Sequence, residues 1–235
     1  MERRTDEVMP DFRFENDRLS SFEDGVRVSP RLRLEWPHTI PSYKSVAADG
    51  FYYTPTVEFK DRVTCFECGK KEKNLIGVTS VATFHYCNRP QCTSALLNSC
   101  LHLGRTNLKN SAFYETLVEQ GDAPYVFVNP VADQSTSLRI STFKGRWKSN
   151  TPGGKANFYR KMAQAGFFFA PRDQNDDRVI CVYCGCTVDR WDERGDPLHE
   201  HEIISKKGMD SLAQEKCYFL AMLEELSDVV LDYTV

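Results

Sequence analysis

Hydrophobic and polar positions follow the same order in the two halves of this 235-residue chain. In each half a run of aromatic residues directly follows a glycine, at Gly50-Phe51 and at Gly166-Phe167. After a turn, a second apolar segment alternates between two faces, at residues 63–66 and 179–182. Short runs of aromatic and β-branched residues between turn residues are typical of β-strands. We therefore predict an α+β fold of two small modules, each a short antiparallel sheet with surrounding helices.

Helical signals flank both predicted sheets. One short helix ends at Gly50, with Pro41 at a favourable position in its first turn, and another spans 156–165. Near the C-terminus, apolar residues recur at roughly helical intervals, which predicts a helix of about four to five turns. We expect its apolar stripe to pack on one of the modules; the alternative is that it begins a longer interaction helix. The stripe consists of Leu212, Phe219, Leu223, Leu226 and Val230.

Between the two modules the pattern weakens into polar residues with scattered glycine and proline. Such a composition is typical of loops and linkers. We predict a connector at 104–138 with one short helix at 112–118. This leaves a first domain at 12–103 and a second domain, which includes the C-terminal helix, at 139–235.

Cysteine and histidine residues repeat at a fixed offset along the chain. Cys65, Cys68 and His85 each have a counterpart 116 positions later. In both copies two residues separate the cysteines and sixteen precede the histidine, which indicates two homologous modules in tandem. The counterparts are Cys181, Cys184 and His201.

A fourth metal ligand is predicted in each module. Cys92 follows the first histidine after six residues and completes a set of three sulfurs and one nitrogen, which suits tetrahedral zinc. In the second copy the next cysteine is Cys217, with fifteen residues between it and the histidine. Cys186 is its rival for that place, and His199 competes with His201. Because four protein ligands close each site, we predict two structural Zn²⁺ ions.

The composition argues against several classes of protein. A net charge of −3 argues against a direct nucleic-acid binder, which is normally basic over a whole face. No apolar run approaches the roughly twenty residues that cross a bilayer, so we expect no membrane contact. Nine cysteines, with no apolar leader after Met1, indicate a reducing compartment. No catalytic motif stands out, and a closed zinc site leaves no position for a substrate, so we expect no enzyme.

These residues resemble the framework of the baculoviral inhibitor-of-apoptosis repeat, or BIR domain, over most of the chain. The framework runs from an arginine through Gly-Phe to Cys-x2-Cys, Trp, Asp-Pro, His and Cys. The second module matches all of it, and the first lacks the Trp and the Asp-Pro. Within the family, the runs that begin at Arg18 and at Cys217 are most similar to the N-terminal region of the fungal survivin-type subunit of the chromosomal passenger complex. The matching residues besides the metal ligands are Arg18, Gly50-Phe51, Arg139, Gly166-Phe167, Trp191 and Asp196-Pro197.

An acidic stretch follows only the second Cys-x2-Cys. Residues 189–202 carry six acidic side chains against two arginines, whereas the matching residues 73–86 carry one lysine and no acid. The resemblance implies a groove in the second module for the free N-terminus of a partner peptide, with Trp191 as its wall and acids facing the ammonium. The alternative is a solvated acidic loop with Trp191 partly in the core. The peptide-binding candidates are Asp189, Trp191, Asp192, Glu193 and Asp196.

The resemblance implies two alternative functions. One is a non-catalytic interaction module of a chromosomal passenger complex subunit, located in the nucleus at the centromere, kinetochore and spindle. Its partners would be kinetochore or passenger-complex proteins, a shugoshin or a histone tail. The other is an inhibitor of apoptosis that binds a caspase-like protease or its antagonists. Arg194 and Gly195 stand where readers of a histone tail have acids, so the identity of the peptide stays open.

Overall fold

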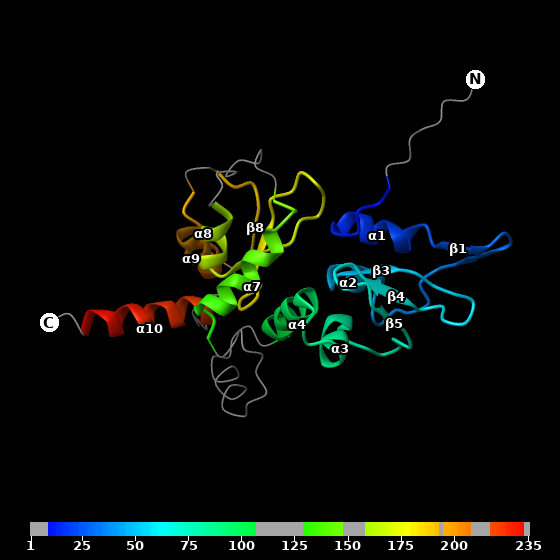
Figure 1. Ribbon diagram of the computed structural model, residues 1–235, viewed down its shortest axis with the longest axis horizontal. Coiled ribbons are helices and arrows are strands. Elements are labelled where there is room, and N and C mark those ends of the chain that lie inside the picture. The colour runs from blue at the N-terminus through cyan, green and yellow to red at the C-terminus, as the bar shows by residue number, and fades with distance from the viewer. Residues whose placement is uncertain (1–8, 107–128, 148–157, 193–194, 208–216, 233–235) are drawn as a thin grey trace, which may run out of the picture.

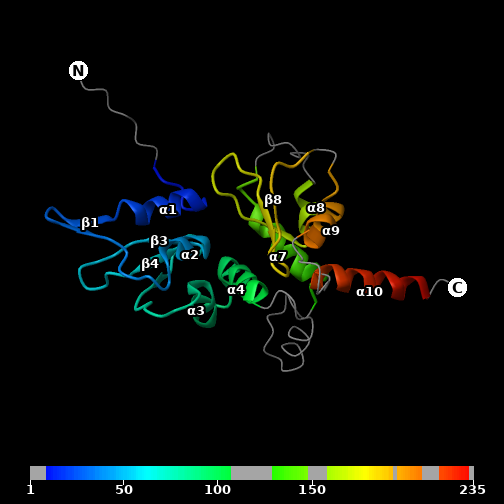
Figure 2. The same ribbon diagram turned by 180° about the vertical axis from the view of Figure 1, so that it is seen from behind.

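The structure is a computed structural model that describes residues 9–106, 129–147, 158–192, 195–207 and 217–232. It contains two mixed modules that lie side by side (Figure 1, Figure 2). Within the described ranges, no helix is both long and apolar enough to cross a membrane.

The first module surrounds a three-stranded sheet with helices and adds a separate hairpin. Its helices are α1 (Glu15–Glu23), α2 (Tyr43–Ala48), α3 (Val81–Asn88) and α4 (Thr93–Thr106). The sheet consists of β3 (Phe51–Tyr53), β4 (Val63–Cys65) and β5 (Lys71–Glu72), and the hairpin of β1 (Val26–Ser29) and β2 (Leu32–Leu34).

The second module repeats this plan around a second three-stranded sheet. Its helices are α7 (Asp133–Phe143), α8 (Phe158–Gln164), α9 (Pro197–Lys207) and α10 (Tyr218–Asp232). Its strands are β6 (Phe167–Phe169), β7 (Val179–Cys181) and β8 (Thr187–Val188).

The two sheets share both strand order and register. Antiparallel pairing of β3 with β4 places Phe51 opposite Cys65, and pairing of β6 with β7 places Phe167 opposite Cys181. Both pairs obey the offset of 116 positions seen in the sequence. The predicted fold of two α+β modules, each a small antiparallel sheet with surrounding helices, is confirmed.

A buried arginine ties the first helix of each module to the helix that precedes its sheet. Nε of Arg18 donates to the carbonyl of Ala47 at 2.8 Å, and Nε of Arg139 donates to the carbonyl of Ala163 at 2.7 Å. Their exposed fractions are 6% and 1%. A buried guanidinium is costly unless its donors are paired, so these backbone carbonyls fix where α1 and α7 pack.

The glycine before each aromatic strand is required by its conformation and its surroundings. Gly50 has φ of +97° and Gly166 has φ of +91°, in the region that disfavours side chains. A Cβ at Gly50 would lie 2.7 Å from Oγ of Ser94, and one at Gly166 would lie 2.9 Å from the ring of Phe219. Any larger residue would push apart the strand and the helix behind it.

Three helix boundaries differ from the sequence prediction. Pro41 lies before the first turn of its helix, because Ser42 is the N-cap of α2 and accepts a hydrogen bond from the amide of Ser45 at 3.2 Å. Helix α4 continues to Thr106, and α7 begins at Asp133, so both helices extend into the predicted connector. The short helix predicted at 112–118 lies outside the described residues.

Helix α4 packs against both modules. Helix α4 reaches across from the first sheet to the second module in both views (Figure 1, Figure 2). Its buried apolar side chains join the core of the second module instead of facing solvent. The two modules therefore share a core. The shared residues of α4 are Leu96, Leu97, Cys100 and Leu101.

Backbone contacts close the same interface on its other side. The amide of Asn16 donates to the carbonyl of Arg172 at 2.9 Å, next to a close ion pair between Arg178 and Glu15. The first helix of one module is thus fastened to the loop after β6 of the other.

Among the described side chains of the C-terminal helix, those at its start pack into the second module. Phe219 is fully buried and Leu220 nearly so in the core of the second module, and Leu223 packs against that core. Leu226 is 46% exposed, and α10 runs away from the module toward the C-terminus (Figure 1). The predicted packing of the apolar stripe therefore holds for its first described members; Leu212 and the side chain of Val230 lie outside the described residues.

Candidate metal centres and peptide groove

The first candidate metal centre joins four separate elements. Cys65 ends β4, Cys68 follows in the turn, His85 comes from α3, and Cys92 immediately precedes α4. Their ligand atoms all lie within 4.8 Å of one another. The sulfurs of Cys65 and Cys92 are 3.8 Å apart, and Sγ of Cys68 is 3.2 Å from Nε2 of His85. The structure brings the whole predicted set together.

The second centre has the same construction. Cys181, Cys184, His201 and Cys217 also have all their ligand atoms within 4.8 Å of one another. The sulfurs of Cys181 and Cys217 are 3.9 Å apart, and Sγ of Cys184 is 3.4 Å from Nε2 of His201. His201 lies on α9 and Cys217 immediately precedes α10, as their counterparts do on α3 and before α4.

The geometry also bears on the two alternative ligands in the second centre, His199 and Cys186. His199 is exposed, whereas His201 is fully buried, so only His201 faces the sulfurs. Cys186 lies close enough to hydrogen-bond with neighbouring sulfurs, but it is not one of the four residues whose ligand atoms all lie within 4.8 Å. This arrangement favours Cys217 as the fourth ligand.

In each cluster at least one cysteine favours thiolate, the form that binds metal, while a neighbouring cysteine has a raised pKa. A shared hydrogen bond with that thiolate and burial raise the pKa of Cys92, and burial and a shared hydrogen bond raise the pKa of Cys217. A hydrogen bond with Cys92 is the main cause that lowers the pKa of the Cys65 thiol to about 4. Burial alone would raise the pKa of Cys181, but hydrogen bonds with nearby sulfurs, that of Cys184 foremost, hold it well below its usual value. Three sulfurs and one imidazole nitrogen within tetrahedral reach fit zinc.

The two histidines are oriented by different partners. Nδ1 of His85 lies 2.5 Å from Oε1 of Glu72, whereas Nδ1 of His201 lies 2.7 Å from the carbonyl oxygen of Ala165. Both bonds hold Nδ1 as the donor and leave Nε2 to face the sulfurs. A partner on the distal ring nitrogen fixes the ring and makes the ligand more basic. Only the first centre has a carboxylate in this role.

The candidate peptide groove begins at a loop that a buried aspartate holds in shape. The carboxylate of Asp177 accepts the amides of Arg190 at 2.6 Å and Trp191 at 2.8 Å. Asp61 does the same for Asn74 and Leu75 in the first module. Arg190 has φ of +60°, a left-handed conformation that is uncommon for such a side chain.

Trp191 lies in the core. It is 3% exposed and packs edge-on against Phe158 and Phe167. Its Nε1 is buried and has no hydrogen-bond partner among the described residues. In this conformation the ring supports the acidic loop from the core and offers a partner little surface, as in the alternative that places Trp191 partly in the core.

The candidate acids differ in their availability. Asp189 forms a close ion pair with Arg172, a residue of the loop after β6 that the sequence analysis did not single out. Nothing in the spacing of Arg172 signals this contact, because the loop meets β8 only in the fold. Asp192 and Asp196 are exposed, and Oδ1 of Asp196 also accepts the amide of Leu198 at 3.0 Å. Glu193 and its neighbour Arg194 lie outside the described residues.

The first module has no acidic counterpart of this loop. Leu75, fully buried, takes the place of Trp191, and Ile76, 78% exposed, takes the place of Asp192. Both loops keep the same aspartate clamp while their outer surfaces have opposite chemistry.

Comparison with known proteins agrees with this tandem arrangement. The BIR, or Inhibitor of Apoptosis, domain family matches residues 18–96 and 139–220. The chromosomal passenger complex protein BIR1 of Saccharomyces cerevisiae is 24% identical over 245 residues, which cover 86% of this chain and 23% of that protein. The chromosomal passenger complex protein bir1 of Schizosaccharomyces pombe is 26% identical, over 83% of this chain and 19% of that protein. The chain thus spans less than a quarter of either fungal relative.

A relative of another kind aligns to a similar extent. Baculoviral IAP repeat-containing protein 3 of Homo sapiens is 26% identical over 220 residues, which cover 90% of this chain and 29% of that protein. Domains of this family bind zinc, and each cluster has the donors and spacing for one ion. The two centres are therefore structural zinc sites.

We expect Cys217→Ser to reduce the zinc content from two ions per chain to one, because a serine hydroxyl cannot replace a thiolate ligand. Cys186→Ser is the matched control and should retain both ions. Elemental analysis of the purified variants measures this. Loss of an ion from Cys186→Ser, with Cys217→Ser unchanged, would show that the wrong sulfur was assigned.

Glu72→Gln should weaken zinc binding at the first centre by about 10- to 100-fold, because the side chain that orients His85 loses its charge. The second centre should be unaffected, since His201 relies on a backbone carbonyl. A chelator titration that resolves the release of the two ions measures both centres in one sample.

The exposed Glu58 provides the control for this charge change, as Glu58→Gln alters the same charge away from the metal. Equal release from both centres in Glu72→Gln would contradict a specific role for this carboxylate.

Proposed function

The chain belongs to the BIR, or inhibitor-of-apoptosis, domain family, and on that basis we propose that it is a non-catalytic protein-interaction unit of a chromosomal passenger complex protein. The observation that carries this proposal is the alignment of both modules with two fungal proteins that bear that name. Closed zinc sites that hold binding loops in place suit an interaction role.

This function places the chain in the nucleus, at the centromere, the kinetochore and the spindle. Its proposed partners are other subunits of the complex, kinetochore proteins, and the N-terminal tail of a shugoshin or a histone. Direct contact with nucleic acid is not part of the proposal, given the net charge of −3.

We further propose that the acidic loop of the second module binds the free N-terminus of one such partner. Asp189, Asp192, Glu193 and Asp196 supply negative charge around the loop that Trp191 supports from the core. A terminal ammonium makes charge-assisted hydrogen bonds with carboxylates, which are stronger than neutral ones. The first module, with Leu75 and Ile76 at the matching positions, lacks the charge for this recognition.

Arg172 adds a condition to this proposal. Its guanidinium pairs with Asp189, and the two side chains are 45% and 31% exposed. An exposed ion pair of this kind contributes little stability, so an incoming ammonium can compete for the carboxylate. Arg172 would therefore lower the affinity for the peptide without blocking the groove.

The alternative function is inhibition of a caspase-like protease, and the human relative favours it. A tagged tandem chain, recovered from extract of dividing cells, separates the two functions. We expect passenger-complex and kinetochore proteins to be enriched over a sample in which chelator has removed the zinc. Enrichment of a protease or its antagonists instead would replace the first function with the second.

A peptide that begins Ala-Arg-Thr should bind the zinc-loaded chain at least about tenfold more tightly with a free N-terminus than with an acetylated one, because acetylation removes the charge. Arg172→Gln should strengthen binding of the free peptide by removing the competing cation, and Asp189→Asn should weaken it. Fluorescence anisotropy with a dye at the C-terminus of the peptide measures all three.

Arg160→Gln is the control, since it makes the same charge change at an exposed residue of α8. Trp191→Ala is not a useful test, because loss of so buried a ring would destabilise the core. Equal affinity for free and acetylated peptides would leave a solvated acidic loop on a structural zinc module.

A further inference from the structure

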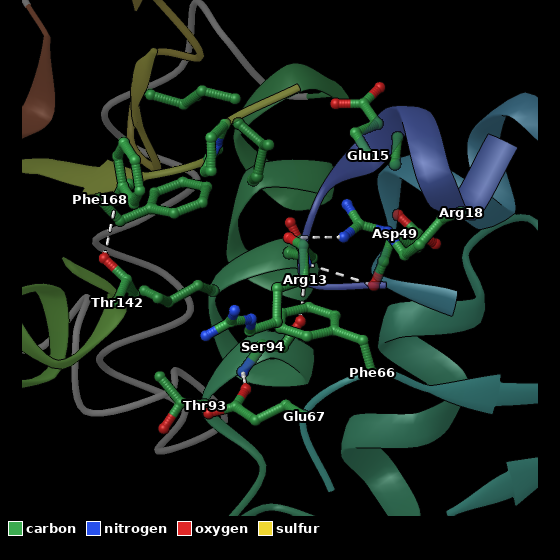
Figure 3. A pocket seen from close by; sticks show the side chains of 18 of the residues that line it. Arg13, Glu15, Arg18, Asp49, Phe66, Glu67, Thr93, Ser94, Thr142 and Phe168 are labelled. Carbon is green, nitrogen blue, oxygen red and sulfur yellow. Dashed lines mark hydrogen bonds between the residues drawn. The ribbon is translucent and has the colours of Figure 1, made fainter. Parts of the chain in front are cut away.

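A second candidate binding site lies between the two modules. A cavity of about 550 Å³ is bounded by α1, α2, α4 and the first zinc loop on one side and by α7 and β6 on the other. Figure 3 shows side chains from both modules facing it, with Arg18 and Asp49 across from Thr142 and Phe168. None of the groove candidates in the acidic loop lines this cavity.

Most charged groups of the cavity already have partners. Arg13 pairs with Asp11, and Arg178 pairs with Glu15. The acidic side chains of Asp49 and Glu67 accept backbone amides of α3 and α4, and Asp49 also accepts the hydroxyl of a nearby serine. The basic side chains in the lining are Arg13, Arg18, Lys144, Arg146 and Arg178, against the acidic Glu15, Asp49 and Glu67.

Arg146, like Arg18, donates only to backbone carbonyls, but it also lies between aromatic rings of the two modules. Its guanidinium lies 5.6 Å from the ring centre of Phe66 in the first module and 5.5 Å from that of Phe169 in the second. Its Nε and Nη2 donate to the carbonyl of Thr142 and its Nη2 to the carbonyl of Phe169, which are neutral acceptors. Within the described residues, no carboxylate lies at ion-pair distance from it. Burial lowers the pKa of Arg146 to about 10, so it is still a cation at neutral pH.

Glu67 and Asp11 act on the charge of Arg146 only at longer range, so the guanidinium can still accept an anion in direct contact. A guanidinium placed between two aromatic rings suits bidentate contact with a carboxylate or a phosphate. Hydroxyls of Ser45, Thr79, Thr93 and Ser94 line the same cavity and can donate hydrogen bonds to such a group. The volume falls within the usual size of binding pockets, which often form at the interface of two domains.

We propose that this cavity binds an acidic side chain, either a carboxylate or a phosphorylated residue, from an internal segment of a protein partner. Arg146 is the main contact, and the hydroxyl-bearing side chains of α4 complete the site. Because both modules build the cavity, only the tandem chain can offer it. The site needs no free N-terminus and does not depend on the groove of the second module.

The test uses the whole zinc-loaded chain and two peptides that are blocked at both ends. Acetyl-Gly-Asp-Glu-Asp-Gly-amide carries the charge, and acetyl-Gly-Asn-Gln-Asn-Gly-amide has the same shape without it. The blocked ends prevent ammonium recognition by the acidic loop. We expect the acidic peptide to bind at least about tenfold more tightly than the neutral one. A third peptide with phosphoserine in place of the central Glu shows whether phosphate or carboxylate is preferred.

Arg146→Gln should weaken binding of the acidic peptide about tenfold or more, and Arg146→Lys should restore part of it. Arg160→Gln, an equal charge change outside the cavity, should leave it unchanged. Because Arg146 also bridges the modules, a second variant leaves Arg146 in place and replaces one hydroxyl of the lining with a negative charge. Thr93→Glu places an acid at the start of α4, where helices tolerate it, and should also weaken binding by repulsion.

Hydrogen exchange locates the site independently of any variant. Bound acidic peptide should slow exchange around 93–98 and 142–146 and leave 187–192 unchanged. Equal binding of the acidic and neutral peptides would overturn the proposal, as would full binding by both Arg146→Gln and Thr93→Glu. Protection confined to the acidic loop would do the same.

Discussion

Each module depends on a four-residue zinc cluster that is also part of its hydrophobic core. The strands that carry it are only three residues long in the case of β3 and β4, too short to hold a sheet by pairing alone. The cluster joins the end of β4, the following turn, α3 and the start of α4 at one point. The imidazole of His85 packs edge-on against Phe51 at 5.3 Å, and His201 lies 4.7 Å from Phe167. Metal binding and core packing therefore stabilise the same contacts, and the binding loops are held only while the metal is bound.

The second constraint is the helix that the two modules share. Leu97 and Cys100 of α4 are buried in the core of the second module, although the helix begins next to a zinc ligand of the first. Disturbance of the first centre would thus reach the second core through α4. The same helix forms a wall of the cavity that Arg146 lines. Because α4 is anchored in the core of the second module, the position of this wall is fixed. Two interaction surfaces in a fixed relation can engage one partner at two points, which raises affinity without further contacts.

The sequence predicted what depends on spacing along the chain. The repeat at 116 positions located three ligands of each set, both aromatic strands and their common register; the fourth ligands, Cys92 and Cys217, do not share this offset. It could not predict contacts between distant segments. The apolar face of α4 has the spacing of an ordinary amphipathic helix. This spacing does not show that the face packs against the second module. The pair of Asp189 with Arg172 and the burial of Trp191 likewise depend on how a loop folds over the sheet.

The loop after each Cys-x2-Cys shows how one scaffold carries two surfaces. Asp61 and Asp177 clamp the backbone in the same way, and the clamped residues Asn74 and Arg190 both have left-handed φ, 58° and 60°. Asparagine adopts this conformation readily, whereas arginine does so at a cost of the order of 1 kcal/mol or more. The strained residue, Arg190, therefore lies next to the acidic loop of the second module. In the first module the unstrained Asn74 lies near the exposed Ile76. Strain of this kind persists where the surroundings enforce it, and in the second loop the carboxylate of Asp177 does so by accepting the amides of Arg190 and Trp191.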